Sequence, residues 1–369
     1  MGRPKLALSS DGGHIPSPLA GEGGPAFLPH LLGKVTPTRS GRAGWGDPSS
    51  HYPPNVDASI SIERILDAAK VIDPVFLHTP QYECEPLSAR IGVRTVLKVE
   101  SVNPIRSFKG RGADYLLHRL AAPEQGFVCA SAGNFGQGMA YACRKRGVPL
   151  TVFAARGANP LKVERMRALG AKVTLQGEDF DQAKDAAKQS ASQNDQTYIE
   201  DGRLGAIAEG AATMAVELSN AGELDAIFVP LGNGSLGNGI GTWQKHASSK
   251  TRVIAVCAES APSMALSWQA GRPVDAASTT IADGIAVRVP VADAVSLMPA
   301  TVDDVMLVSD DEMRDAMRYL LADSGLVVEP AGAAGVAAIA KRSQFEGGRV
   351  AAIITGGNLT DAQVRDWLY

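Results

Sequence analysis

Lys109 is the residue of this sequence whose surroundings most favour covalent chemistry. It lies in the segment 103–113, which reads NPIRSFKGRGA. A lysine amine attacks a carbonyl carbon only in its neutral form, and burial beside cationic or apolar groups lowers the pKa of a lysine and so supplies that form. A lysine between a phenylalanine and a glycine is more often a surface residue, so the neighbouring motifs decide whether Lys109 is a nucleophile.

Three glycine-rich segments accompany this lysine, and each follows a strand. They are 131–138 (SAGNFGQG), 232–239 (GNGSLGNG) and 355–358 (TGGN). Where a strand leads through such a loop into a helix, free backbone N–H groups and the positive end of the helix dipole together hold an anion. One such loop is often only a tight turn, but three of them beside Lys109 favour a binding site.

The elements that must position these motifs alternate along the chain. A helix is expected at 63–70 behind Ser61 as a cap, and further helices at 113–120, 139–143, 160–168 and 179–192. Apolar, β-branched strands are expected at 95–99, 148–153, 171–175, 226–230, 253–256 and 350–354. Strands that alternate with helices predict an α/β fold with parallel sheets covered by helices on both faces.

Length and composition suit a two-domain globular protein. The chain has 369 residues, of which 45% are hydrophobic and 20% charged, and its formal net charge is −3. No basic stripe interleaved with aromatic residues is present, so we expect no nucleic-acid partner. No run of 18 apolar residues and no secretory signal occur, which argues against a membrane or export. Residues 1–56 are rich in Gly, Pro and Ser and read as a disordered extension.

The four cysteines, which have no metal-ligand spacing, fit a reducing cytoplasm and argue against a zinc site.

The motifs together resemble the fold type II pyridoxal-phosphate enzymes, and within them the serine/threonine dehydratases. The resemblance runs from about Thr79 to Asn358, and it is carried by the segments 107–113, 131–138, 232–237, 279–287, 329–333 and 355–358. It implies the architecture of the tryptophan synthase β subunit: two three-layer αβα domains with parallel-rich sheets and the cofactor in the cleft between them. The large domain would combine 57–124 with 206–369, and the small domain would span 125–205.

The resemblance also implies roles for single residues. Lys109 would bind pyridoxal phosphate covalently and later remove the Cα proton of the substrate, Asn134 would bind the 3′-oxygen of the cofactor ring, and Thr355 would face the ring nitrogen. The implied cofactor-binding set is Lys109, Phe108, Asn134, Gly232, Asn233, Gly234, Ser235, Leu236, Glu329 and Thr355, with the amides of 232–236 around the phosphate. The implied substrate-binding set is Ser107, Ser131, Ala132, Gly133 and Asn134, with the carboxylate at the helix start.

Several positions depart from the pattern of that family. Asn233 and Ser235 stand where glycine is usual, which leaves the backbone donors but puts the loop angles in question. Ala132 stands where the racemases have a proton-donating serine, which disfavours racemisation. Relatives bind a divalent cation through a Glu and an Asp six residues on. Here Glu259 is followed by Ala265, so we expect no metal.

Two further substitutions, Arg106 for glycine and Glu209 for glutamine, receive no role from the sequence.

The predicted function is conversion of L-threonine or L-serine to a 2-oxo acid and ammonia. β-Replacement, threonine synthesis and dehydration of another β-hydroxy amino acid such as 3-hydroxyaspartate remain alternatives, as does a descendant without activity. The segment 232–237 also fits the GxGxxG pattern of NAD-dependent dehydrogenases, although this leaves Lys109 and Thr355 unexplained. The resemblance implies a homodimer. We expect no C-terminal regulatory domain, because the sequence ends at Tyr369, just past the motif at 355–358.

Overall fold

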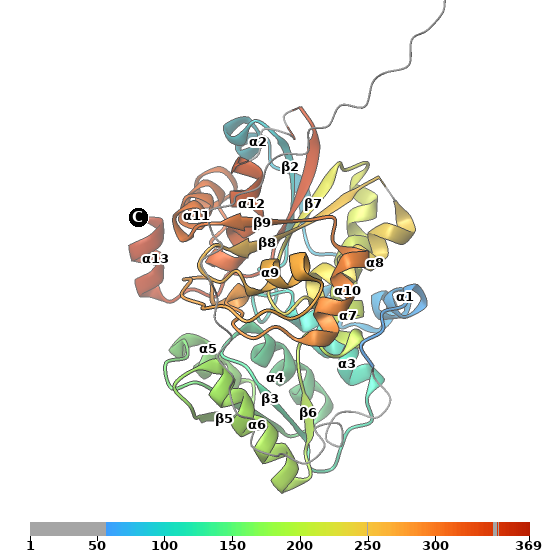
Figure 1. Ribbon diagram of the computed structural model, residues 1–369, viewed down its shortest axis with the longest axis vertical. Coiled ribbons are helices and arrows are strands. Elements are labelled where there is room, and N and C mark those ends of the chain that lie inside the picture. The colour runs from blue at the N-terminus through green and yellow to red at the C-terminus, as the bar shows by residue number, and fades with distance from the viewer. Residues whose placement is uncertain (1–56, 249, 342–344, 346) are drawn as a thin grey trace, which may run out of the picture. The chain divides into compact units, whose positions relative to one another are not determined.

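A computed structural model describes residues 57–248, 250–341, 345 and 347–369 of the chain (Figure 1). The predicted disordered extension, residues 1–56, lies outside the described residues.

The larger of two sheets has six strands in the order β1-β2-β10-β7-β8-β9 (Figure 1). β1 is antiparallel to β2, and the other pairs are parallel. The strands are β1 (Gln81–Glu83), β2 (Arg94–Val99), β7 (Ala226–Pro230), β8 (Arg252–Ala258), β9 (Asp304–Val308) and β10 (Arg349–Ile354). Because parallel strands end at the same edge of a sheet, the loops after β2, β7 and β10 lie near one another.

The second sheet has four parallel strands in the order β5-β4-β3-β6. They are β3 (Phe127–Ala130), β4 (Leu150–Ala154), β5 (Lys172–Leu175) and β6 (Thr197–Ile199). All four fall within the segment that the sequence assigned to the small domain, 125–205. The domain boundaries themselves stay a prediction.

Helices fill the connections between the strands. They are α1 (Ile62–Val71), α2 (Glu85–Ile91), α3 (Lys109–Arg119), α4 (Asn134–Arg146), α5 (Pro160–Ala168), α6 (Phe180–Asn194), α7 (Gly205–Leu218), α8 (Ser235–Ala247), α9 (Ser263–Ala270), α10 (Ala292–Thr301), α11 (Asp310–Ser324), α12 (Pro330–Lys341) and α13 (Asp361–Leu368). Ser61 caps α1 by accepting from the amide of Arg64, as predicted.

Two helices begin earlier than the sequence predicted, and both bear on the site. α3 begins at Lys109 rather than at residue 113, and α4 begins at Asn134 rather than at 139. Glycines in their first turns hid these starts, because glycine lowers helix propensity. The glycines serve close packing: a Cβ at Gly138 would lie 2.8 Å from the carbonyl oxygen of Lys109. The two helix starts therefore touch.

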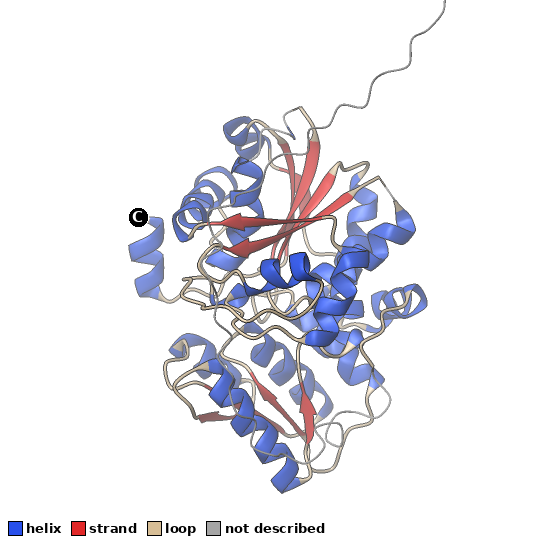
Figure 2. Ribbon diagram, viewed as in Figure 1, coloured by secondary structure: helices blue, strands red, loops and turns tan. Residues whose placement is uncertain are grey.

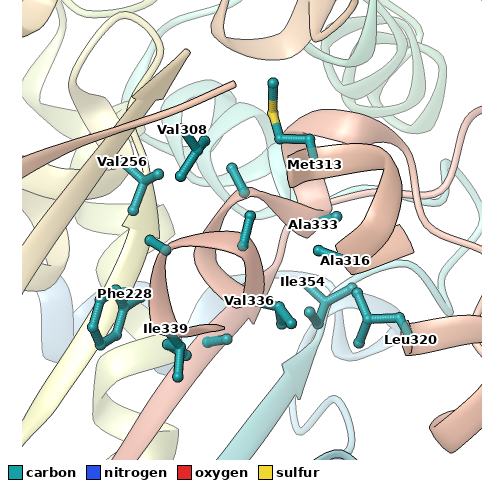
Figure 3. Packing of buried hydrophobic residues seen from close by; sticks show 14 of the residues in the cluster. Phe228, Val256, Val308, Met313, Ala316, Leu320, Ala333, Val336, Ile339 and Ile354 are labelled. Atoms are coloured by element: carbon teal, nitrogen blue, oxygen red, sulfur yellow. The ribbon is translucent and has the colours of Figure 1, made fainter. Parts of the chain in front are cut away.

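Helices cover both faces of the six-stranded sheet (Figure 2). Side chains alternate between the faces along each strand. Phe228 and Ile354 pack on one face against α11 and α12, and Figure 3 shows this cluster around Val336. Ile227 and Ile353 point to the opposite face and pack against α7 and α8. This alternation confirms the α/β arrangement predicted from the sequence.

A buried ion cluster joins β2, α3 and α7. Arg111 is fully buried, and its guanidinium binds Glu100 Oε2 at 2.9 Å and Glu217 Oε1 at 2.6 Å. Lys98, also fully buried, pairs with the same Glu217. Neither the guanidinium nor the ammonium has access to solvent. The carboxylates of Glu100 and Glu217 therefore neutralise both positive charges inside the protein.

Candidate active site

A cavity of about 380 Å³ contains every predicted site residue except Ser107. Its wall is formed by the ends of strands and the starts of helices from both sheets, including the loops 131–134 and 232–236. A volume of a few hundred Å³ suits a small-molecule site.

Lys109 projects its amine into this cavity from the first position of α3. Lys109 Nζ donates to Asp201 Oδ2 at 2.5 Å, and it lies 4.7 Å from the centre of the Phe108 ring. Asp201 Oδ1 in turn accepts from Ser235 Oγ at 2.6 Å. Asp201 therefore links the predicted nucleophile to the loop at the start of α8.

The loop between β7 and α8 is shaped to hold an anion. Gly234 caps α8 with a φ of 92°, a conformation that favours glycine. A Cβ at Gly232 would lie 2.7 Å from the carbonyl oxygen of Gly284. The amides of residues 232–236 donate to no atom among the described residues. These donors sit at the positive end of a 13-residue helix. The glycine departures at Asn233 and Ser235 thus leave the helix start intact.

The start of α4 forms a second polar loop in the cavity. Ser131 Oγ accepts from the amides of Gly133 and Gly136, at 3.2 and 2.8 Å. The amides of Asn134 and Phe135 donate to no atom in the part of the chain that the structure describes. The loop therefore keeps donors for a ligand at the helix start.

Glu329 and Asn134 join the motifs behind the cavity. Asn134 Nδ2 donates to Glu329 Oε1, and Asn358 Nδ2 donates to Asn134 Oδ1 at 2.8 Å. A Cβ at Gly356 would lie 2.4 Å from Glu329 Oε1, so only glycine leaves room for this carboxylate. Burial raises the pKa of Glu329 above its ordinary value, while the charge of Lys162 acts against that rise.

Lys162, from α5, is a second lysine in the cavity. Its Nζ donates to both carboxylate oxygens of Asp283 and lies 3.2 Å from Glu329 Oε2. Burial by itself would lower the pKa of Lys162, but the charges of Glu329 and Asp283 outweigh it and raise that pKa. Lys162 is therefore a buried ammonium group.

Ser107 is fully buried and does not line the cavity. Its hydroxyl accepts from the amide of Lys109 at 3.4 Å, and its backbone forms a bridge with Gly356. Its predicted substrate contact stays a prediction.

The structure places the two substitutions that the sequence left open. Arg106 has a φ of 49°, in the left-handed region, which accounts for a position where relatives have glycine. Its side chain is exposed, and it is absent from the cavity wall. Glu209 binds the Arg64 guanidinium and the amide of Ser61, so it anchors α1.

Glu259 lies away from the cavity and pairs with Lys341 at 3.2 Å. Among the described residues, no group of three or more His, Cys, Asp or Glu side chains could hold a metal. Within the same residues, every helix is too short or too polar to cross a membrane.

A family model described as "Pyridoxal-phosphate dependent enzyme" matches residues 72–356. The chain belongs to this family. It is 34% identical over 304 residues to the L-threonine ammonia-lyase of Thermotoga maritima. The matched region covers 81% of this chain and 76% of that protein.

Solved structures agree with this family. The structure of maize serine racemase covers 83% of this chain and 96% of its own, with a TM-score of 0.78 and 26% identity. The processed threonine deaminase isoform 2 of Solanum lycopersicum covers 84% of this chain and 95% of its own, with a TM-score of 0.76 and 26% identity. The fold is therefore the fold type II architecture that the motifs implied, and pyridoxal phosphate is the cofactor.

The residues of this pyridoxal-phosphate enzyme fit its cofactor. The amides at 232–236, which have no acceptor among the described residues, suit a phosphate group. A Cβ at Gly232 would fill space beside that loop, so glycine at this position keeps the loop open. Lys109 Nζ reaches the same cavity and suits an aldehyde. Asn134 and Thr355 line the remaining wall, where they would face the ring. The individual roles of these residues stay predictions.

Sequence reasoning missed Asp201 and Lys162. Asp201 follows β6 in a stretch without a motif, and Lys162 lies inside a helix where a lysine is normally a surface residue. The one available signal was helical spacing: Lys162 lies four residues before Met166, so both fall on one face of α5, and both are buried.

Proposed function

We propose that this enzyme dehydrates and deaminates L-threonine or L-serine, giving a 2-oxo acid and ammonia. The observation that carries the proposal is the position of Lys109 Nζ in a cavity that two open helix starts also line, those of α4 and α8. One helix start suits the phosphate of the cofactor and the other suits the carboxylate of an amino acid. The activity in the name of the Thermotoga maritima relative supports the same reaction.

Different residues act at different steps of the reaction. Bound pyridoxal phosphate supplies an electron sink that stabilises negative charge at the Cα of the substrate. Lys109 takes the Cα proton at Nζ. Asp201 Oδ2, 2.5 Å away, then neutralises the ammonium group that results.

Two residues favour elimination over other outcomes. Thr355 lines the cavity where the ring nitrogen would lie, and a hydroxyl stabilises a protonated ring nitrogen less than a carboxylate does. The weaker electron sink favours early loss of a β leaving group. Ala132 offers no acid to return a proton to the opposite face of Cα, which disfavours racemisation.

The test is the absorption spectrum of the purified protein, followed by separate addition of L-threonine, L-serine and threo-3-hydroxyaspartate. We expect a visible band from the lysine-bound cofactor, and release of 2-oxo acid from L-threonine or L-serine. A band that shifts with substrate but releases no oxo acid would contradict dehydration and favour β-replacement. Release from threo-3-hydroxyaspartate alone would reassign the substrate.

Replacing Asp201 with asparagine should lower kcat/KM for L-threonine about 10- to 100-fold. The carboxylate holds the Lys109 ammonium at 2.5 Å, and a hydrogen bond between charged groups contributes about 1.5–3 kcal/mol. The measurement is the initial rate of oxo acid release. As a control, Glu200→Gln alters the adjacent carboxylate, which pairs with Lys184 instead. An Asp201→Asn enzyme with the rate of the wild type would show that Asp201 has no part in the reaction.

We further propose a homodimer in the cytoplasm. The family resemblance supports the dimer, and the four buried, unpaired cysteines suit a reducing compartment. Sedimentation velocity of the purified protein checks the dimer.

A further inference from the structure

The ammonium group of Lys162 has no part in the reaction steps above, although it lies in the cavity. Lys162 is 2% exposed, and its Nζ bonds to Asp283 Oδ1 and Oδ2 at 2.8 and 2.7 Å. Glu329 Oε2 lies 3.2 Å from the same nitrogen. The single positive charge of Lys162 is therefore shared by two carboxylates.

The two carboxylates are held very differently. Glu329 is 2% exposed and also accepts from Asn134 Nδ2 and from the amide of Asn358. The Asp283 side chain is 46% exposed, and among the described residues Lys162 is its only side-chain hydrogen-bond partner. A half-exposed carboxylate returns to water at little cost, whereas a buried one does not. Asp283 is thus the partner that can leave.

Lys162 also borders the loop at the start of α4. A Cβ placed on Gly133 would lie 3.5 Å from Lys162 Cδ and 3.7 Å from its Nζ. The open amides of Asn134 and Phe135 belong to the same loop. A carboxylate bound at this helix start would therefore lie beside the ammonium group, with a charged donor added to the backbone donors.

We propose that Lys162 binds the carboxylate of the substrate, and that this carboxylate displaces Asp283. The inference rests on the proposed function, because an amino-acid substrate supplies the carboxylate. The exchange replaces one carboxylate by another, so no buried charge is left without a partner. Asp283 is therefore a counterion of the substrate-free enzyme and a competitor of the substrate.

The experiment measures binding of propanoate, which has the carboxylate but no amine, to the holoenzyme. The rise of the thermal unfolding midpoint with propanoate concentration gives its affinity without turnover. Lys162→Met should weaken propanoate binding about tenfold or more, because a charged hydrogen bond is lost. Asp283→Asn should strengthen it, because the competing carboxylate is gone.

Opposite changes of propanoate affinity in the two variants distinguish this exchange from a salt bridge that only stabilises the fold. Breaking such a salt bridge from either side would change the affinity in the same direction. Lys172→Met, which removes an exposed lysine of β5 that does not line the cavity, is the control and should leave propanoate binding unchanged. L-Threoninamide, which lacks the carboxylate, should bind the Lys162→Met and wild-type enzymes alike.

Weaker or unchanged propanoate binding in Asp283→Asn overturns the proposal, and so does a wild-type enzyme that propanoate does not stabilise. This holds even where Lys162→Met fails to fold, because Asp283→Asn keeps Lys162 paired with Glu329. Propanoate binding as expected, without oxo acid release from L-threonine or L-serine, would remove the proposed function and leave the role of Lys162 standing.

Discussion

We expect the Lys109→Ala enzyme to lose at least roughly a thousandfold in kcat for L-threonine and to lose the visible absorption band. In the proposed reaction, Lys109 supplies the amine that reaches the aldehyde of the cofactor and the base that reaches Cα. Because alanine supplies neither, one substitution removes both steps. The measurement combines the spectrum of the purified variant with its rate of oxo acid release.

The control for this experiment is Lys184→Ala, which removes another lysine from the same cavity wall. That variant should keep the absorption band. A Lys109→Ala protein that retains the band would show that another lysine holds the cofactor, with Lys162 as the first candidate because its Nζ also borders the cavity.

Arg111→Met should have the largest effect on stability, about 3–5 kcal/mol, because it breaks a buried ion cluster from one side. Both Arg111 and Glu100 are fully buried, so the substitution leaves the Glu100 carboxylate without a cation in a dry site. The measurement is the thermal unfolding midpoint of the cofactor-loaded protein. Arg94→Met, which changes an exposed arginine paired with Glu83, is the matched control and should unfold as the wild type does.

The same cluster gives the effect a pH dependence. Burial acts to raise the pKa of Glu217, but hydrogen bonds and charge from Arg111 outweigh it and hold that pKa below its usual range. A depressed carboxyl pKa stabilises the fold above the ordinary value, and this contribution is lost as the pH falls through the depressed one. The gap between wild type and Arg111→Met should therefore be widest near neutral pH and narrow in acid. A gap that grows in acid would contradict this account.

Sequence reasoning recovered the strands β2, β4, β5, β7, β8 and β10 and the motif loops, because both depend on local pattern. The strands β1, β3, β6 and β9 were not predicted. Apolar β-branched runs predicted β7 and β10 with their bounds or within one residue. The glycine loops and Lys109 were recognisable because a family resemblance supplied their meaning. The predicted helix starts at 113 and 139 were wrong, because the glycines that pack tightly after the true starts, Lys109 and Asn134, resemble breaks in a helix.

The missing part of the site consists of contacts between segments far apart in the chain. Asp201 meets Lys109, and Lys162 meets Asp283 and Glu329, only after both sheets have formed. A charged residue with no motif around it reads as a surface residue in one sequence. A partner from a distant segment shows that such a residue belongs to the site, and the local sequence pattern does not reveal that partner.

The central place of β10 in its sheet has a consequence for biosynthesis. β10 lies between β2 and β7, with Arg349 paired to Arg94 and Val350 to Ala226. On the ribosome, β2 emerges long before β10, so its inner edge stays uncovered until β10 has been synthesised. The strands β3 to β6, contiguous in sequence, can pair meanwhile. The nascent protein thus exposes an unpaired strand edge until β10 has been synthesised, which makes chaperone protection most valuable before Thr355 arrives beside Lys109.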